Sequence, residues 1–240
     1  MTNKQRIEYW NIWNDHFDNK GMELDAMKSL VEFDGKKILE IGCGNGRISR
    51  LLGPLCNQLT AIDNNELMLD AANTYNNPPN IEFHKMDALD LLFDKNTFDI
   101  VIFSWVLTCM QGYELQALTE AKKVINKRGK VLIVDFGNTS EYDDIIKPFV
   151  KESKTYGART DNANITELLK DIFSEPIDVI GPLSTEYKFD TESQLCEMIE
   201  FALYELHQTK VNDRENFKIH LSEYGQGYKE SVLCYCAENK

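Results

Sequence analysis

Short apolar runs alternate with amphipathic segments through most of this 240-residue chain, and the alternation limits the folds it can form. Runs rich in Ile, Val and Leu occur at 36–42, 58–65, 81–87, 98–105 and 129–137, and helix-like segments follow most of them. The run at 98–105 is apolar nearly throughout, as a parallel strand buried on both faces should be. This pattern predicts an α/β protein with a doubly wound, mostly parallel sheet and helices on both faces.

The later part of the chain departs from strict alternation. An amphipathic segment at 165–173 predicts a helix that leads to a sixth strand at 177–189. Two helical runs follow between 191 and 225, and a seventh strand at 230–238 returns to the sheet. No internal repeat or low-complexity linker divides the sequence, so we expect residues 1–240 to form a single seven-stranded domain with helical additions.

Composition and charge narrow the functional classes. The chain is 42% hydrophobic and carries a net charge of −13, without a dense run of Lys and Arg that could overcome repulsion from a polyanion. We therefore expect no nucleic-acid partner. The sequence has no long apolar stretch and no apolar signal core near its start, so we expect a cytoplasmic protein without a membrane segment. The six scattered cysteines predict mostly buried thiols rather than a metal site or a disulfide framework.

Three glycines at every second position, Gly42, Gly44 and Gly46, follow the first apolar run in ILEIGCGNGRISRLLG (38–53). The turn after the first strand of a doubly wound sheet lies at the carboxyl edge, where such folds bind ligands. Glycines there permit positive φ angles and let a ligand approach the backbone. A glycine-rich loop alone is weak evidence, but the G-x-G-x-G spacing differs from the G-x-G-x-x-G of dinucleotide-binding proteins.

With an acid two residues before the first glycine, LEIGCGNG (39–46) resembles the first motif of the class I S-adenosylmethionine-dependent methyltransferases. The resemblance is to the small proteins that share an E/D-x-G-x-G-x-G loop, and it covers residues 35–137 well and the rest only by pattern. It implies a Rossmann-like sheet, S-adenosylmethionine as the cofactor and S-adenosylhomocysteine as its product.

The resemblance also implies cofactor contacts at the ends of the first four strands. Asp63 would bind both ribose hydroxyls, Asp87 would lie near the adenine amine, and the end of the fourth strand would contact the methionine part. Taken singly, Asp63 could be a solvated acid, Asp87 a turn cap and Ser104 a loop hydroxyl. The implied cofactor residues are Glu40, Gly42, Cys43, Gly44, Gly46, Asp63, Asn64, Met68, Asp87, Ala88, Phe103 and Ser104.

Two positions depart from the family pattern. Asn64 stands where many members have an apolar residue that covers adenine, so Leu67 or Met68 is expected to provide that cover. Thr108 and Cys109 stand where many members have a His pair, so a base at that place is not implied.

Aromatic residues near the start of the chain are candidates for the acceptor pocket. Tyr9, Trp13 and His16 are three or four residues apart, on one face of an expected helix, and Trp10 lies beside them. Packing against the sheet would explain the same pattern. Aromatic rings stabilise a sulfonium through cation–π contact, which suits the tryptophans. The candidate acceptor-binding residues are Tyr9, Trp10, Trp13, Trp105 and Tyr224, and the candidate bases are His16 and His220.

Three segments are expected to cover the site: a helical lid at 1–30, and insertions at 138–163 and 190–227 that either cover the substrate or mediate a homodimer. The resulting hypothesis is a methyltransferase that acts on an oxygen, nitrogen or carbon atom of a small metabolite, without a metal. The alternatives are a tRNA or protein methyltransferase and a non-catalytic protein that binds S-adenosylmethionine beside a partner enzyme.

Overall fold

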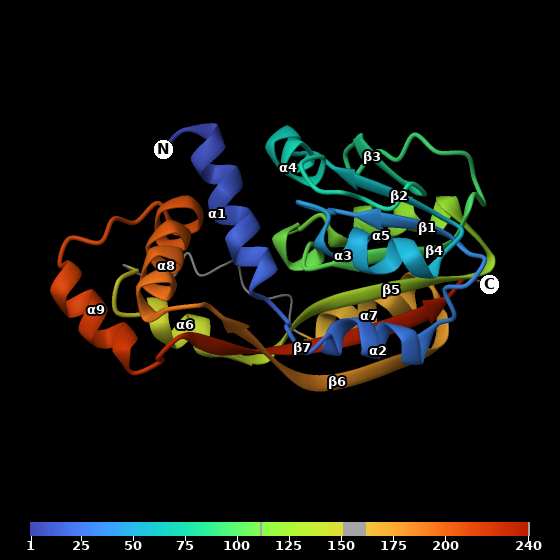
Figure 1. Ribbon diagram of the computed structural model, residues 1–240. Helices are drawn as coiled ribbons and strands as arrows, with labels where there is room; N and C mark the ends of the chain where they lie inside the picture. The colour runs from blue at the N-terminus through green and yellow to red at the C-terminus, as the bar shows by residue number, and fades with distance from the viewer. Residues whose placement is uncertain (111, 151–161, 240) are drawn as a thin grey trace.

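The computed structural model describes residues 1–110, 112–150 and 162–239. Within these residues, seven strands form one sheet in the order β3-β2-β1-β4-β5-β7-β6 (Figure 1). Neighbouring strands from β3 to β5 are parallel, and β7 is antiparallel to both β5 and β6. The strands are β1 (Lys37–Ile41), β2 (Gln58–Asp63), β3 (Ile81–Lys85), β4 (Phe98–Ser104), β5 (Ile125–Ser140), β6 (Ser174–Lys188) and β7 (Gly227–Glu238). The predicted seven-stranded, mostly parallel sheet is confirmed.

Helices cover both faces of the sheet (Figure 1). One face packs against α5 (Glu114–Val124) and α7 (Asn162–Ile172). The other packs against α2 (Met22–Leu30), α3 (Arg47–Leu52) and α4 (Glu66–Ala72). Two short 3-10 helices, η1 (Gly53–Leu55) and η2 (Leu107–Cys109), follow α3 and β4. Strand order reverses between β1 and β4, and the switch point where ligands bind in such folds therefore lies at their carboxyl ends.

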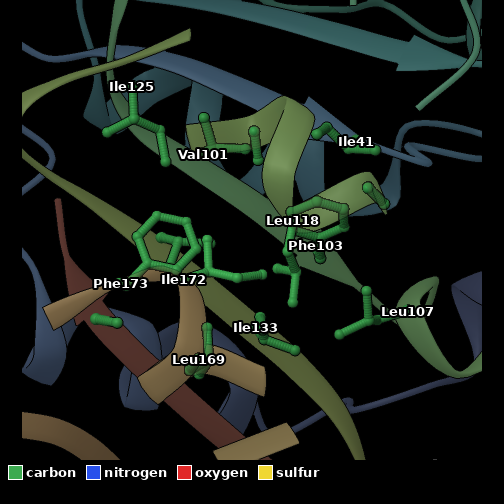
Figure 2. Packing of buried hydrophobic residues seen from close by; sticks show 14 of the residues in the cluster. Ile41, Val101, Phe103, Leu107, Leu118, Ile125, Ile133, Leu169, Ile172 and Phe173 are labelled. Atoms are coloured by element: carbon green, nitrogen blue, oxygen red, sulfur yellow. The ribbon is translucent and has the colours of Figure 1, made fainter. Parts of the chain in front are cut away.

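The core divides according to the two-residue period of the strands. Ile38 packs on the α2 and α3 face, whereas Leu39 and Ile41 pack on the α5 and α7 face. Figure 2 shows the second cluster, where Phe103 of β4 lies beside Leu118 of α5. Full burial of one such side chain contributes about 1.5–3 kcal/mol, so these layers stabilise the sheet that carries the site.

A third cluster packs helices at the carboxyl edge of the sheet. It joins α1 (Asn3–Asp15), α6 (Glu141–Ile146), α8 (Glu192–His207) and α9 (Arg214–Ser222), and α1 stands between α8 and the rest of the domain (Figure 1). The side chains of Thr191 and Asp213 cap α8 and α9 by accepting hydrogen bonds from backbone N–H groups. Helices therefore occupy the expected lid at 1–30 and the expected insertion at 190–227; of the insertion at 138–163, residues 151–161 lie outside the described residues.

The expectation of buried cysteine thiols is met at three of the six positions. Cys43, Cys234 and Cys236 are buried, Cys56 and Cys196 are half-buried, and Cys109 is exposed. No helix in the described part of the chain is both long and apolar enough to cross a bilayer.

Candidate active site

A cavity of about 560 Å³ lies at the carboxyl ends of β1, β2 and β4. One side is formed by the glycine loop and the strand ends, and another by α1. The far wall comes from β6, β7 and the segment around α6. Within the described residues, no group of three or more His, Cys, Asp or Glu side chains could hold a metal ion.

The glycine loop is held against β2 and leaves its surface open. The N–H groups of Gly42 and Cys43 both donate to the carbonyl oxygen of Ile62, at 2.8 and 2.9 Å. Gly42 and Gly44 have φ angles of +71° and +55°. A Cβ atom on Gly42 would lie 2.3 Å from Cγ2 of Val106, whereas one on Gly44 would meet nothing within 4 Å. Gly42 therefore allows close packing, and Gly44 provides free space beside the cavity.

Asp63 ends β2 beside this loop. Its Oδ2 accepts a hydrogen bond from the N–H of Gly44 at 2.9 Å, and its Oδ1 accepts one from the N–H of Asn65 at 2.8 Å. Burial raises the pKa of Asp63 while these N–H groups lower it, and the net shift is upward. Asn64 and Met68 line the cavity next to it. The carboxylate is thus positioned to accept further hydrogen bonds from a ligand's hydroxyl groups.

Glu40 is a buried acid under the loop, 1% exposed. Its Oε2 accepts a hydrogen bond from Oγ of Ser49 at 2.5 Å. Burial raises the pKa of Glu40 to about 7, although Ser49 and the cation of Arg47 act to lower it. Glu40 therefore changes its charge near neutral pH.

The end of β4 contributes Ser104 and Trp105. Ser104 is 8% exposed and lines the cavity, and its Oγ has no hydrogen-bond partner among the described residues. A buried hydroxyl of this kind is normally satisfied, so it marks a place for a polar ligand group. Trp105 follows with a φ of +60°, and its N–H donates to the carbonyl oxygen of Val134 at 2.8 Å. Non-glycine residues in this region of φ cluster at functional sites.

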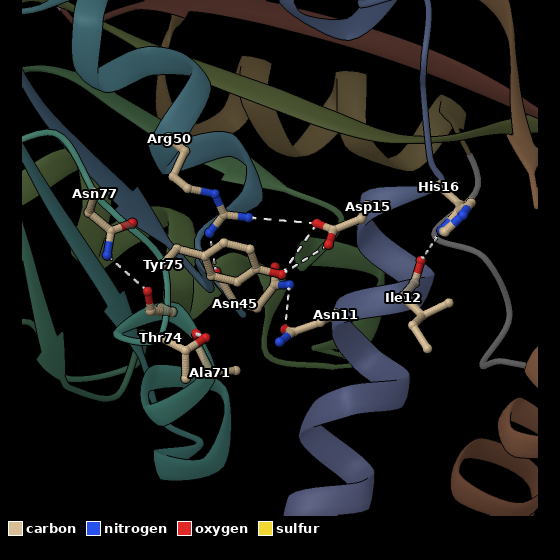
Figure 3. A network of polar contacts seen from close by, with 11 residues as sticks. Asn11, Ile12, Asp15, His16, Asn45, Arg50, Ala71, Thr74, Tyr75 and Asn77 are labelled. Atoms are coloured by element: carbon tan, nitrogen blue, oxygen red, sulfur yellow. Dashed lines mark hydrogen bonds and ion pairs between the residues drawn. The ribbon is translucent and has the colours of Figure 1, made fainter.

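Polar contacts fasten α1 over the loop (Figure 3). Nδ2 of Asn45 donates to Oδ1 of Asn11 at 3.0 Å, and the hydroxyl of Tyr75 donates to Asp15 at 3.1 Å. The guanidinium of Arg50 lies 3.6 Å from the Tyr75 ring centroid, and its Nη1 donates to the carbonyl oxygen of Asn45 at 2.7 Å. These contacts hold the α1 residues that line the cavity, which are Trp10, Trp13 and Asn14.

The far wall is aromatic and acidic. The rings of Tyr187 and Tyr228 stack 4.8 Å apart, and Trp13 lies 5.1 Å from Tyr187. Tyr142 is 5.8 Å from Tyr228. Glu230, 3% exposed, accepts a hydrogen bond from Oγ of Ser140 at 2.5 Å. Burial, and to a lesser extent the charge of Glu230, raises the pKa of Tyr187 above its ordinary range. Tyrosine side chains and a carboxylate thus line the cavity opposite the glycine loop.

Comparison with known sequences agrees with this geometry. A family profile described as a methyltransferase domain matches residues 39–133. The chain is 29% identical over 115 residues to phthiotriol/phenolphthiotriol dimycocerosates methyltransferase 1 of Mycobacterium ulcerans, across 46% of this chain and 41% of that protein. It is 31% identical over 115 residues to demethylmenaquinone methyltransferase of Staphylococcus carnosus, across 46% of this chain and 47% of that protein. The chain thus spans less than half the length of these relatives.

Solved structures share the fold over nearly the whole chain. The YcgJ protein of Bacillus subtilis superposes with a TM-score of 0.66 at 14% identity, over 91% of this chain and 98% of that one. Phosphoethanolamine N-methyltransferase 2 of Haemonchus contortus, in complex with phosphomonomethylethanolamine and S-adenosylhomocysteine, gives a TM-score of 0.57 at 16% identity, over 91% and 52% of the two chains. Residues 39–133 thus match a methyltransferase domain, and nearly the whole chain shares a fold with solved methyltransferases. The glycine loop, Asp63 and Ser104 lie inside the matched residues, whereas the aromatic wall lies outside them.

Several residues that the sequence resemblance implied for the cofactor do not line the cavity. Phe103 and Ala88 are buried in the cluster on the α5 face, because the strand period points Phe103 away from its neighbour Ser104. Gly46 precedes α3 with a φ of +77° and supports the loop from behind. Asp87 is exposed, and its Oδ1 accepts a hydrogen bond from the N–H of Leu89 at 2.9 Å. This contact is the one expected if Asp87 caps a turn.

The candidate bases and two aromatic residues also lie outside the cavity. Nδ1 of His16 donates to the carbonyl oxygen of Ile12 at 2.7 Å, and Nε2 of His220 donates to that of Ile145 at 3.1 Å. Tyr9 stacks on Phe201, 4.9 Å between ring centroids, and Tyr224 packs against His220 at 5.8 Å. Of the expected acceptor residues, those that line the cavity are Trp10, Trp13 and Trp105. Neither imidazole lines the cavity.

Other residues of the site carry no local signal in the sequence. Tyr187, Tyr228 and Glu230 belong to strands, where they read as ordinary strand residues. Arg47 is the exception, because it directly follows the third glycine and its position next to the loop singles it out.

Proposed function

We propose that this protein is an S-adenosylmethionine-dependent methyltransferase that acts on a small-molecule metabolite. The observation that carries the proposal is a single cavity with two unlike sides. The glycine loop, Asp63 and Ser104 form one side, and the wall around Tyr187 forms the other. A cofactor on the first side and an acceptor on the second would meet in one cavity, and such proximity and alignment supply much of the catalysis of a transfer reaction.

The residues present fit the cofactor. The open space at Gly44, the unsatisfied hydroxyl of Ser104 and the carboxylate of Asp63 correspond to an amino-acid tail and a ribose. We assign Asp63 to the ribose hydroxyls, and the loop from Gly42 to Gly44 with Ser104 to the amino-acid tail. When bound, S-adenosylmethionine supplies an electrophilic methyl group on a positively charged sulfur.

The remaining residues would orient the acceptor and exclude water. Trp10 and Trp13 of α1 and Leu206 of α8 close the cavity on the side away from the sheet. This arrangement favours substrate covering as the role of the segment at 190–227. A cavity of about 560 Å³ with an aromatic wall suits a small molecule better than a polymer, and the net charge of −13 disfavours a nucleic acid. The names of the two bacterial relatives, which describe methyltransferases of lipid-like and quinone-like molecules, support the same class.

The test is incubation of the protein with methyl-labelled S-adenosylmethionine and a fractionated cell extract. We expect label in the small-molecule fraction, and no label with the Asp63→Ala variant. Label in the RNA or protein fraction alone would favour a macromolecular substrate instead. Tight cofactor binding without turnover on any fraction would favour the non-catalytic alternative.

A further inference from the structure

Glu23 and Arg47 form an ion pair at the cavity wall, which Arg47 lines. Nη1 of Arg47 lies 2.6 Å from Oε2 of Glu23, whose side chain is fully buried, while the side chain of Arg47 is 15% exposed. The carboxylate of Glu23 also accepts a hydrogen bond from the indole of Trp105. A buried carboxylate needs such partners, because burying it unpaired is costly. The same contacts fix the positions of the guanidinium and of the indole.

The guanidinium keeps donors for a further partner. An arginine side chain has five N–H donors in a planar fork. In the described part of the chain, Arg47 donates one side-chain hydrogen bond, to Glu23. Its Cζ lies 4.9 Å from the ring centroid of Phe17, which supports the fork from one side. Burial acts to lower the pKa of Arg47, but Glu23 raises it and the net shift is upward, so the group stays charged.

The guanidinium of Arg47 and the carboxyl group of Glu40 are two charged groups in one part of the cavity. Among the described residues that line the cavity, Arg47 is the one cation, and it is the first residue of α3, directly after the glycine loop. Glu40 lines the same part of the cavity, close enough for Arg47 to lower its pKa against the larger effect of burial. A cation and an acid beside one loop match a zwitterion, with a carboxylate at Arg47 and an ammonium toward Glu40.

We propose that Arg47 binds the carboxylate of the cofactor's amino-acid tail and that Glu23 is the positioning residue that aims its fork into the cavity. This inference rests on the function proposed above. A planar guanidinium matches a carboxylate through two parallel hydrogen bonds, which a lysine cannot reproduce. Glu23 comes from α2, so a helix outside the glycine-loop unit takes part in cofactor recognition.

The test compares S-adenosylhomocysteine with its decarboxylated analogue, S-adenosyl-3-thiopropylamine, by calorimetric titration without acceptor. The Glu23→Gln/Arg47→Gln double variant removes both charges and therefore leaves no buried charge unpaired. We expect this variant to bind S-adenosylhomocysteine about ten-fold or more weakly than the unmodified protein, and the analogue within about two-fold of it.

Two further variants serve as controls for this binding comparison. Arg47→Lys keeps a cation beside Glu23 without the planar fork, so we expect a smaller loss that is again confined to S-adenosylhomocysteine. The Glu200→Gln/Arg214→Gln variant removes an ion pair of 2.5 Å on the surface between α8 and α9, and we expect it to bind both ligands like the unmodified protein.

The remaining outcomes separate this inference from the proposed function. An equal loss for both ligands, or no loss for either, would overturn the role of Arg47 while leaving the proposed function in place. Unchanged binding of S-adenosylhomocysteine with a raised KM for the acceptor would assign Arg47 to the acceptor and would also overturn it. Failure of the unmodified protein to bind either ligand would contradict the proposed function itself.

Discussion

Gly42 and Gly44 are two residues apart, yet side chains added at the two positions would meet different surroundings. At Gly42 a Cβ atom would collide with Val106, whereas at Gly44 it would enter open space. Both residues have positive φ angles, so any replacement also strains the backbone. The first glycine thus allows close packing in the fold, and the second leaves open space beside the cavity.

The different surroundings of Gly42 and Gly44 predict that substitutions there affect mainly stability at the first position and mainly ligand binding at the second. Gly42→Ala should lower the free energy of unfolding by about 2–4 kcal/mol, from overpacking and backbone strain together. Gly44→Val should cost about 1–2 kcal/mol of stability, from strain alone, but should abolish or severely weaken binding of S-adenosylhomocysteine. Denaturant unfolding and calorimetry measure the two effects.

Gly35→Val is the control for Gly44→Val, because Gly35 has a φ of +70° and open space around its Cα but does not line the cavity. We expect the same loss of stability with unchanged binding. Full affinity in Gly44→Val would contradict the assignment of the loop.

The raised pKa of Glu40 predicts that the stability of the protein depends on pH. Burial raises its pKa from 4.5 to about 7 in the folded chain, so the folded state favours the protonated form. This preference stabilises the fold below pH 4.5 and is lost as the pH rises to about 7. Glu40→Gln removes the charge at the same size, so its stability relative to the unmodified protein should rise across that window by on the order of 3 kcal/mol and then level off. Urea unfolding at a series of pH values measures this difference, and a difference independent of pH would contradict it.

At the scale of elements, α1 forms one side of the cavity. It carries Trp10 and Trp13 to the cavity and is joined to the cofactor side of the domain through Asn11 and Asp15 (Figure 3). Its other side packs on α8, where Tyr9 stacks on Phe201. The helix therefore bridges the glycine-loop unit and the helical cluster, and a ligand under it leaves faster when one bridge is weakened.

The Asp15→Asn/Tyr75→Phe variant removes the contact between α1 and Tyr75. We expect release of S-adenosylhomocysteine to become about five-fold faster, because one exposed hydrogen bond contributes a net of about 1 kcal/mol. Stopped-flow tryptophan fluorescence can follow release, since all three tryptophans of the chain line the cavity. The Glu66→Gln/Lys85→Gln variant is the control. It removes an exposed ion pair between α4 and β3, with 2.9 Å between the two charged groups and no residue of α1 in it, and should leave the rate unchanged. An unchanged rate in the first variant would show that α1 does not limit release.

At the scale of the whole molecule, the two sides of the site come from different parts of the chain. The glycine loop, Asp63 and Ser104 lie within residues 39–133, which match the methyltransferase profile. The far wall comes from β6, β7 and the segment around α6, and these strands of 15 and 12 residues are longer than the five residues of β1. Their length carries Tyr187 and Tyr228 beyond the ends of the central strands. Because the wall lies outside the shared stretch, the acceptors of the relatives do not define the acceptor of this protein.

The sequence by itself determined most of the elements and the position of the glycine loop. The two-residue and helical periods predicted all seven strands and most helices, because periodicity reports local backbone geometry. The spacing of Gly42, Gly44 and Gly46, with Asp63 at the next strand end, identified the edge where the cavity lies. These features are local, so they can be read along the chain.

Only the tertiary structure decided which side chains face the cavity. Phe103 and Ser104 are neighbours in the sequence, but the register of β4 places one in the core and the other in the site. Glu23 reaches Trp105 across 82 residues, and no local pattern predicts that contact. Helical spacing aligned Tyr9, Trp13 and His16, but the packing of α1 against α8 left only Trp13 of these three at the cavity. Contacts of this kind depend on how elements pack, and periodicity within one element does not specify its neighbours.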